Sequence, residues 1–194
     1  MAINLQKGAA ISLEKEKPGL SKVVLGTGWG KKVGKGLFGA RKEIAIDLDA
    51  SCLVFDESRA LIDAVWFRQL RSKDGAVQHT GDDLTGGGSA NDPNEEIAVQ
   101  INQINPKAKS LVFTINSFSN DSFEGIPNAF CVLKDAASGS EIARFDLSVE
   151  GRSHTGLIIA KLYRHNGEWK FKALGEWGEG RTFDKLIPNI LPHI

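Results

Sequence analysis

The residues of this chain best suited to hold a metal ion lie in one acidic, glycine-rich stretch, residues 81–96. Carboxylates held close together repel one another unless they take up protons or a cation lies among them. Calcium accepts about six to eight oxygen ligands, and glycines let the backbone turn its carbonyls toward one point. The stretch therefore predicts a calcium-binding loop, with a solvated connector as the alternative. It has no basic residue and five carboxylates: Asp82, Asp83, Asp92, Glu95 and Glu96.

A second pair of carboxylates, Asp47 and Asp49, lies in the strongest predicted strand, residues 43–55. Side chains alternate along a strand, so residues two apart point to the same face. An EF-hand loop that began at Asp47 would need glycine at its sixth position and glutamate at its twelfth. Those positions hold Cys52 and Ser58, which excludes an EF-hand. Two aspartates on one face remain candidate metal ligands, with an exposed pair at the rim of a sheet as the alternative.

The elements that must position these carboxylates are expected to be strands. Short alternating runs recur at near-regular spacing, separated by turn signals such as Ser72–Gly75, Ser138-Gly139 and Asn166-Gly167. This pattern predicts an all-β chain, an antiparallel β-sandwich of about ten to twelve strands in a single domain, 1–194. Predicted strands include residues 10–14, 64–70, 96–104 and 110–118, and residues 181–187 predict one short helix stopped by Pro188.

A basic, glycine-rich segment, residues 31–42, contrasts with the acidic stretch. Gly34, Gly36 and Gly39 match a dinucleotide fingerprint formally, but such a site needs a helix after the glycines, and here a strand is predicted from Glu43. A surface loop is the simpler interpretation. Its five basic residues, with Leu37 and Phe38, also suggest docking to a partner or to an anionic membrane. A small-ligand or nucleotide-binding protein that uses this loop is the alternative function; the cyclic-nucleotide form of this alternative rests on a label attached to proteins that the chain resembles.

The composition narrows the remaining functional classes. Basic and acidic residues balance, so net charge gives no indication of a nucleic-acid partner. Cys52 and Cys131 lie in apolar runs, which predicts buried free thiols and a reducing compartment. The N-terminus has no apolar signal core and no window is long enough to span a membrane, so a cytoplasmic protein is expected. No catalytic constellation is found, and no zinc spacing exists among the histidines, which are expected at the surface or rim: His79, His154, His165 and His193.

Taken together, several motifs resemble the TerD family of tellurite-resistance and stress proteins, in order along nearly the whole chain. They are Ile-Asp-Leu-Asp-Ala-Ser at 46–51, Gly-Asp-Asp-Leu-Thr-Gly at 81–86, Asn-Ala-Phe at 128–130, Ala-Arg-Phe-Asp-Leu at 143–147 and Tyr-Arg-His-Asn-Gly-Glu-Trp-Lys at 163–170. Residues 65–75 and 154–160 are similar to the TerZ branch of that family.

The resemblance implies a β-sandwich that binds Ca²⁺ through acidic loops, without established catalytic activity, in a bacterial cytoplasm. It also implies action with other Ter-family proteins and association with a membrane-embedded Ter partner. The loop departs from the family pattern, because Ser89, Ala90 and Asn91 replace part of its acidic stretch and Pro93-Asn94 are inserted. Weaker binding, or one site instead of two, is therefore expected. The residues that match the family's ligand positions are Asp47, Asp49, Asp82, Asp83, Asp92 and Glu95.

Overall fold

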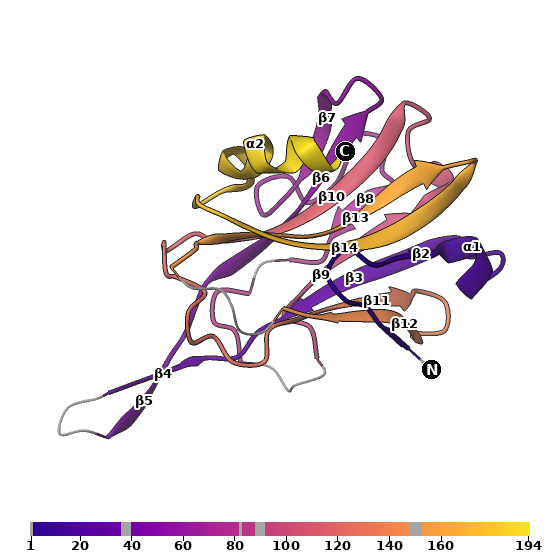
Figure 1. Cartoon of the computed structure of the whole chain (residues 1–194). Coiled ribbons are helices and arrows are strands. Elements are labelled where there is room, and N and C mark those ends of the chain that lie inside the picture. The colour runs from indigo at the N-terminus through magenta and orange to yellow at the C-terminus, as the bar shows by residue number, and fades with distance from the viewer. Residues whose placement is uncertain (1, 36–39, 82, 88–91, 148–152) are drawn as a thin grey trace.

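The computed structural model describes residues 2–35, 40–81, 83–87, 92–147 and 153–194. Two six-stranded sheets pack face to face, and a separate two-stranded ribbon projects from one end of the sandwich (Figure 1). The predicted all-β sandwich is confirmed, with fourteen strands among the described residues in place of ten to twelve. No helix within the described ranges is long and apolar enough to cross a membrane.

The neighbouring strands of both sheets run antiparallel, except for one parallel pair that joins β1 to β12. In spatial order the first sheet contains β1 (Ile3–Asn4), β12 (Glu141–Asp146), β11 (Phe130–Asp135), β3 (Lys22–Gly28), β9 (Glu95–Gln100) and β8 (Val77–His79). The second contains β2 (Ala10–Ser12), β14 (Glu168–Gly178), β13 (Gly156–His165), β10 (Ala108–Ser117), β6 (Leu48–Asp56) and β7 (Leu61–Val65).

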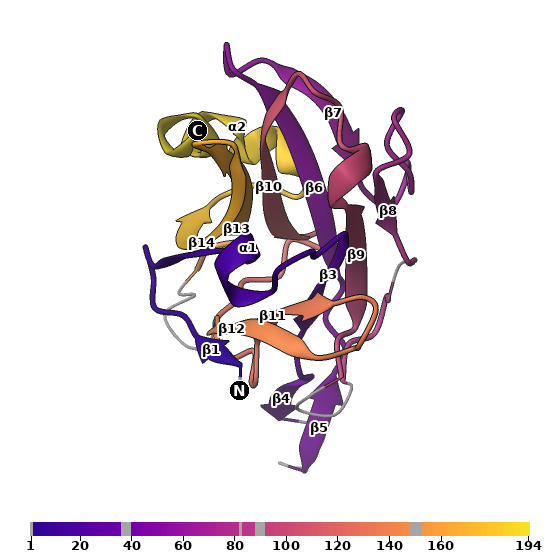
Figure 2. The ribbon, with the colours of Figure 1, turned by 90° about the vertical axis from the view of Figure 1, so that its right-hand side faces the viewer.

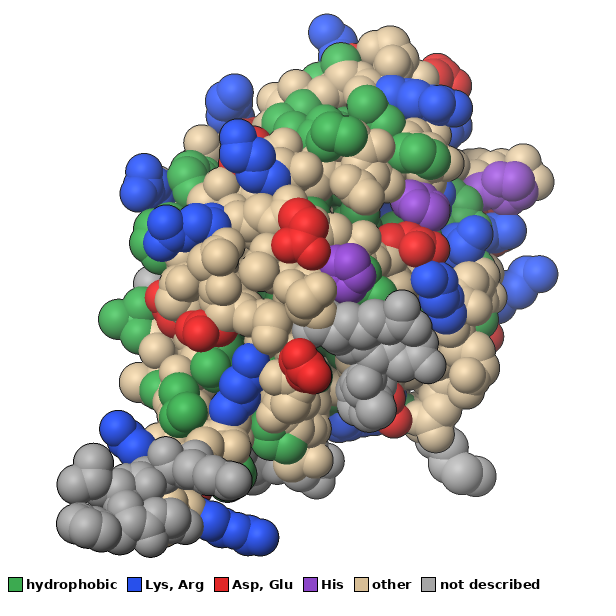
Figure 3. All heavy atoms as spheres, turned by 60° about the vertical axis from the view of Figure 1, so that its left-hand side comes forward, with side chains coloured by type: hydrophobic (Ala, Val, Ile, Leu, Met, Phe, Trp, Pro, Cys, Tyr) green, Lys and Arg blue, Asp and Glu red, His purple; other side chains and the backbone are tan. Residues whose placement is uncertain are grey.

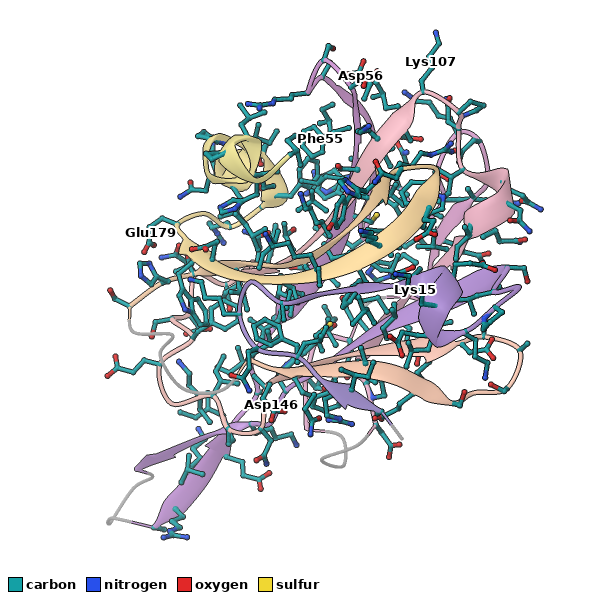
Figure 4. The ribbon with its side chains drawn as sticks, turned by 45° about the vertical axis from the view of Figure 1, so that its right-hand side comes forward. Lys15, Phe55, Asp56, Lys107, Asp146 and Glu179 are labelled. Carbon is teal, nitrogen blue, oxygen red and sulfur yellow. The ribbon has the colours of Figure 1, made fainter. Side chains whose placement is uncertain are left out.

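The main hydrophobic core lies between the two sheets and takes alternate residues of their strands. On β9, for example, Ile97 and Val99 are buried while Ala98 is only partly covered. A second, smaller cluster lies on the outer face of the second sheet, where Phe55 packs with Leu186 and Ile190 of the C-terminal helical segment (Figure 4). Because β6 is covered on both faces, all of its residues from Leu48 to Phe55 are buried.

The helical segments are short. α1 (Leu13–Glu16) forms where the sequence predicted strand up to residue 14, because the Ser12 hydroxyl accepts a hydrogen bond from the Lys15 N–H at 3.4 Å and caps a helical turn. α2 (Ile187–Ile190) follows a 3₁₀ turn at Phe183–Leu186 and precedes one at Leu191–His193. The prediction that Pro188 stops the helix was wrong, because Pro188 lies in the first turn of α2, where no N–H donor is needed.

Two predicted strands extend too far. β9 ends at Gln100 and a 3₁₀ turn, Ile101–Gln103, follows, so strand does not continue to residue 104. β7 ends at Val65, and Trp66 and Gln69 close a turn through reciprocal backbone hydrogen bonds, so residues 66–70 are not strand. In both places apolar residues continue past the end of the strand into a turn, where Ile104 is buried and Leu70 is 44 % exposed.

The basic segment is a ribbon and not a plain loop. β4 (Lys32–Lys35) pairs with β5 (Arg41–Ile44), and residues 36–39, including Leu37 and Phe38, lie outside the described residues. Gly34 lies within β4 and a strand follows the glycines, so the helix that a dinucleotide site needs is replaced by β5. Figures 1 and 2 agree that the ribbon projects at one end of the molecule, away from α2 and the turn between β6 and β7.

Both thiols are free and buried, as the sequence predicted, and burial raises the pKa of Cys52 and of Cys131. We expect neither thiol to react with an aromatic disulfide reagent at pH 8 in the folded protein, because the thiolate is the nucleophile. Both should react once guanidinium unfolds the chain, which absorbance at a visible wavelength measures. Rapid reaction of one thiol in the folded protein would contradict the burial.

Candidate metal centre

The acidic loop connects β8 to β9, which are antiparallel neighbours, so it is fastened at both ends by strands as its flanks predicted. At its base the Thr80 N–H donates to the Glu96 carbonyl at 2.9 Å. Near its C-terminal end the Asn94 N–H donates to the Thr27 carbonyl on β3 at 2.8 Å. These bonds limit the freedom of the loop ends.

Glu95 ties the loop to both sheets. Its side chain is 1 % exposed, although it belongs to β9 of the first sheet. One carboxylate oxygen accepts the N–H of Ala50, on β6 of the second sheet, at 2.7 Å, and the other accepts the N–H of Asp83 in the loop at 3.1 Å. Hydrogen bonds to a carboxylate are among the stronger ones in proteins. Glu95 therefore holds the acidic loop against the beginning of β6.

His79 faces the same carboxylate. It is 2 % exposed, so the prediction of a surface or rim histidine was wrong at this position. Its Nε2 lies 3.3 Å from Glu95 Oε2, and its Nδ1 accepts the N–H of Gly81 at 3.1 Å. Val77 and His79 share the inward face of β8, so the alternation of that strand places the imidazole inside.

Asp83 braces the loop from within. One carboxylate oxygen accepts hydrogen bonds from the backbone and hydroxyl of Thr85, at 2.9 and 2.8 Å, and the other accepts from the Asn94 side-chain amide at 2.9 Å. Partial burial opposes ionisation, but these bonds outweigh it and lower the pKa of Asp83. A lowered pKa in the folded state contributes stability above the ordinary aspartate pKa, and this contribution is lost as the pH falls through the folded value.

Trp29 joins the loop to the base of the ribbon. It is 3 % exposed, and its indole N–H donates to the carbonyl of Ile46 at 3.0 Å, across the two legs of the ribbon. Its backbone N–H donates to the Asn94 side chain at 2.8 Å, and its carbonyl accepts the N–H of Gly87 at 3.1 Å. Sequence reasoning missed Trp29, and the available signal was a large aromatic residue between Gly28 and Gly30, where a glycine-rich segment was taken for a loop.

Asp47 and Asp49 lie at the beginning of β6, next to the point where Glu95 attaches the loop. Asp49 is 6 % exposed, and Asp47 is partly covered. One carboxylate oxygen of each, Asp47 Oδ1 and Asp49 Oδ2, is buried. The exposed rim pair, which was the alternative interpretation, is therefore excluded.

Asn116 is a further oxygen donor that sequence reasoning missed. It pairs in register with Asp49 across β6 and β10, so their side chains point to the same face of the sheet. It is 1 % exposed, and its side-chain amide donates to the Gly180 carbonyl at 2.8 Å. Within the part of the chain that the structure describes, its Oδ1 has no hydrogen-bond partner. A buried amide oxygen of this kind is a ligand type that calcium uses.

The predicted ligands are only partly brought together. Asp92 is exposed, and Asp82 lies outside the described residues, as do residues 88–91. Among the residues that are described, no three His, Cys, Asp or Glu side chains are grouped so that they could hold a metal ion. The shared cage of six carboxylates thus stays a prediction, while two of its members, Asp83 and Glu95, have their oxygens engaged by loop and strand N–H groups.

The chain is similar to known proteins along nearly its whole length. The TerD domain family model matches residues 1–188. The tellurium resistance protein TerZ of Serratia marcescens is 44 % identical over 97 % of each chain, and general stress protein 16U of Bacillus subtilis is 35 % identical over 93 % of each. The crystal structure of a Streptomyces coelicolor homologue of the telluride resistance protein TerD has a TM-score of 0.62 at 17 % identity, covering 84 % of this chain and 92 % of that chain.

The contact between loop and indole can be tested at Gly86, whose φ is +62°. A Cβ there would lie 2.4 Å from Trp29 Nε1. Gly139 has a φ of +69° and nothing within 4 Å of such a Cβ, so it is a matched control for backbone strain alone. Gly139→Ala should cost about 1–2 kcal/mol of unfolding free energy, and Gly86→Ala clearly more. Urea unfolding measures both, and equal losses would show that the loop does not pack on Trp29.

Proposed function

The chain belongs to the TerD family, and on that premise we propose that it is a calcium-binding, non-enzymatic module of a bacterial stress-response and tellurite-resistance assembly. The relatives described above carry resistance or stress names, which supports the general role. None of those names describes an enzyme, which favours a binding module over a catalyst.

The observation that carries the calcium proposal is the attachment of the acidic loop to the beginning of β6 through Glu95. Glu95 bonds to Ala50, the residue that follows Asp49, and one carboxylate oxygen each of Asp47 and Asp49 is buried. The donors are all oxygens, which suit a hard divalent cation. The residues present thus fit calcium in their chemistry.

The contacts suggest a division of roles. Asp47, Asp49 and Asn116 would offer oxygens from the strands, and Asp82 and Asp92 from the loop. Glu95 and Asp83 would position the loop, since their oxygens already accept N–H donors. Bound calcium would supply positive charge among these carboxylates and remove their mutual repulsion.

The alternative is a small ligand or cyclic nucleotide bound by the basic segment. The strand–strand geometry of β4 and β5 offers no helix N-terminus for a phosphate, which weakens this alternative. Nucleotide that raises the melting temperature without added metal, and that loses this effect when Lys31, Lys32 and Lys35 are substituted, would favour it over calcium. Association with other Ter-family proteins is part of the proposal and rests on family membership alone.

The calcium proposal is tested by titrating chelator-treated protein with calcium and following heat and melting temperature. At a hundredfold excess over Kd, binding should stabilise the fold by about 2.7 kcal/mol, or roughly 5–10 °C for a domain of this size. Magnesium should do less, because its small octahedral shell suits a protein cage poorly. Asp47→Asn and Asp49→Asn should reduce the shift, whereas Asp146→Asn, at an exposed carboxylate on β12 (Figure 4), should not. The absence of heat and of any shift at millimolar calcium would reject the proposal.

The role of Asn116 as a calcium ligand is tested with Thr114 as the control. Thr114 lies two residues earlier on β10, and its hydroxyl is also buried without a hydrogen-bond partner among the described residues. Asn116→Ala should lower metal-free stability by about 1 kcal/mol, because the bond to Gly180 is lost, and should also diminish the calcium-induced shift. Thr114→Val should leave the calcium-induced shift unchanged. If Asn116→Ala keeps the whole shift, Asn116 is a structural residue and not a ligand.

A further inference from the structure

The β4–β5 ribbon is largely exposed, and packing against the sandwich does not explain why it projects. A two-stranded ribbon is marginally stable by itself, and its strands pair only with each other among the described residues. All four residues of β5 are exposed, and Val33 on β4 is 64 % exposed. Figure 3 shows basic side chains beside its outer end.

The base of the ribbon, in contrast, is held firmly. The Trp29 indole bonds to Ile46 across its two legs at 3.0 Å, and the Gly30 N–H donates to the Pro127 carbonyl at 2.8 Å. The Lys32 ammonium donates to the carbonyl of Ser122. The ribbon therefore leaves the sandwich in a direction that the fold sets.

The ribbon and the residue before it are rich in basic side chains. Residues 31–44 contain five basic residues and one acid, Glu43, although the whole chain is neutral. Glu43 is matched by Lys31, whose Nζ lies 3.6 Å from its carboxylate. Arg41 and Lys42 are adjacent on β5, so they point to opposite faces, and both are exposed. Lys35 pairs in register with Arg41 at the outer end of the described ribbon.

Apolar side chains accompany these cations. Val33 and Ile44 are 64 % and 43 % exposed and lie on opposite faces, because Val33 is in register with Glu43 and Ile44 with Lys32. Cations and apolar groups together suit the interface of an anionic lipid bilayer, which attracts the charges and takes up apolar surface. A nucleic-acid backbone would bind the cations, but it would offer no apolar surface to the two aliphatic side chains.

We propose that the β4–β5 ribbon is a docking arm for the anionic surface of a lipid membrane. The surface charge of the lipid would attract Lys35, Arg41 and Lys42, and Val33 and Ile44 would enter the interface. This inference is independent of calcium binding, so it is tested in the presence of a chelator.

The test is co-sedimentation of the full chain with vesicles of phosphatidylcholine containing about one third phosphatidylglycerol. A basic residue near such a surface contributes about 1 kcal/mol, or about fivefold in affinity, so Lys35→Gln, Arg41→Gln and Lys42→Gln together should weaken binding roughly a hundredfold. The control with the same change in net charge combines Lys15→Gln, Lys73→Gln and Lys107→Gln, at exposed lysines outside the ribbon. Figure 4 places Lys15 and Lys107 well away from it.

Val33→Ser with Ile44→Ser should also weaken vesicle binding, and higher salt should weaken it because charge attraction is screened. Melting temperatures of all variants should match the parent, since Val33, Arg41, Lys42, Ile44 and the three control lysines are exposed. Equal vesicle binding by both triple variants, equal binding to pure phosphatidylcholine vesicles, or binding to duplex DNA without vesicle binding would each overturn the proposal. Equal binding by both triple variants would mean that the cations serve only to protect the ribbon edges from pairing with other chains.

Discussion

A buried carboxylate that bonds to both sheets is the constraint on which this end of the molecule depends. Removing a charge from water costs several kcal/mol unless hydrogen bonds replace its hydration. Glu95 receives such bonds from Ala50 on the opposite sheet and from Asp83 in the loop, with the His79 ring beside it. Apolar packing between the sheets is not directional, whereas these bonds fix which loop atoms meet which residue of β6. The location of the acidic loop follows from them.

Hydrogen bonds within the acidic loop likewise reduce how much of its backbone a ligand would have to order on binding. Fixing the backbone of one residue costs about 1–2 kcal/mol, so a free loop of this length would lose much binding energy on closing around a cation. Here Asp83 fastens Thr85, Asn94 fastens Trp29, and Gly87 bonds to the Trp29 carbonyl. Part of the ordering is therefore complete before any ligand binds, which is the advantage of preorganisation.

Much of this arrangement could be predicted from the sequence, because it depends on local periodicity. The sandwich and the strand-flanked acidic loop both follow from alternation and turn residues. Alternation could also have shown that Glu95 points inward, since it lies two and four residues before Ile97 and Val99, while Glu96 lies on the opposite face. What periodicity cannot show is which distant group meets a buried side chain.

Contacts of that second kind explain the remaining errors. The bonds from Trp29 to Ile46, from Ala50 to Glu95 and from Asn116 to Gly180 join residues far apart in the chain, and no local pattern encodes them. His79 was expected at the surface or rim, yet the buried carboxylate of Glu95 beside its ring allows the imidazole to lie on the inner face of β8. Similarly, the residues around Pro188 do not show whether a helix begins or ends there.

The basic ribbon and the acidic loop are oppositely charged segments whose bases touch, because the Gly87 N–H donates to the Trp29 carbonyl. The aliphatic part of Lys31 lies over Gly87, since a Cβ on that glycine would come within 2.7 Å of it. Opposite charges that lie closer together than the screening length, about 8 Å at physiological salt, attenuate each other's field. β4 has four residues, or about 13 Å of strand, which carries the outer end of the ribbon beyond that length. A partner that approaches the outer end therefore meets a positive field that the acidic loop does not cancel, and the length of the ribbon is what separates the two fields.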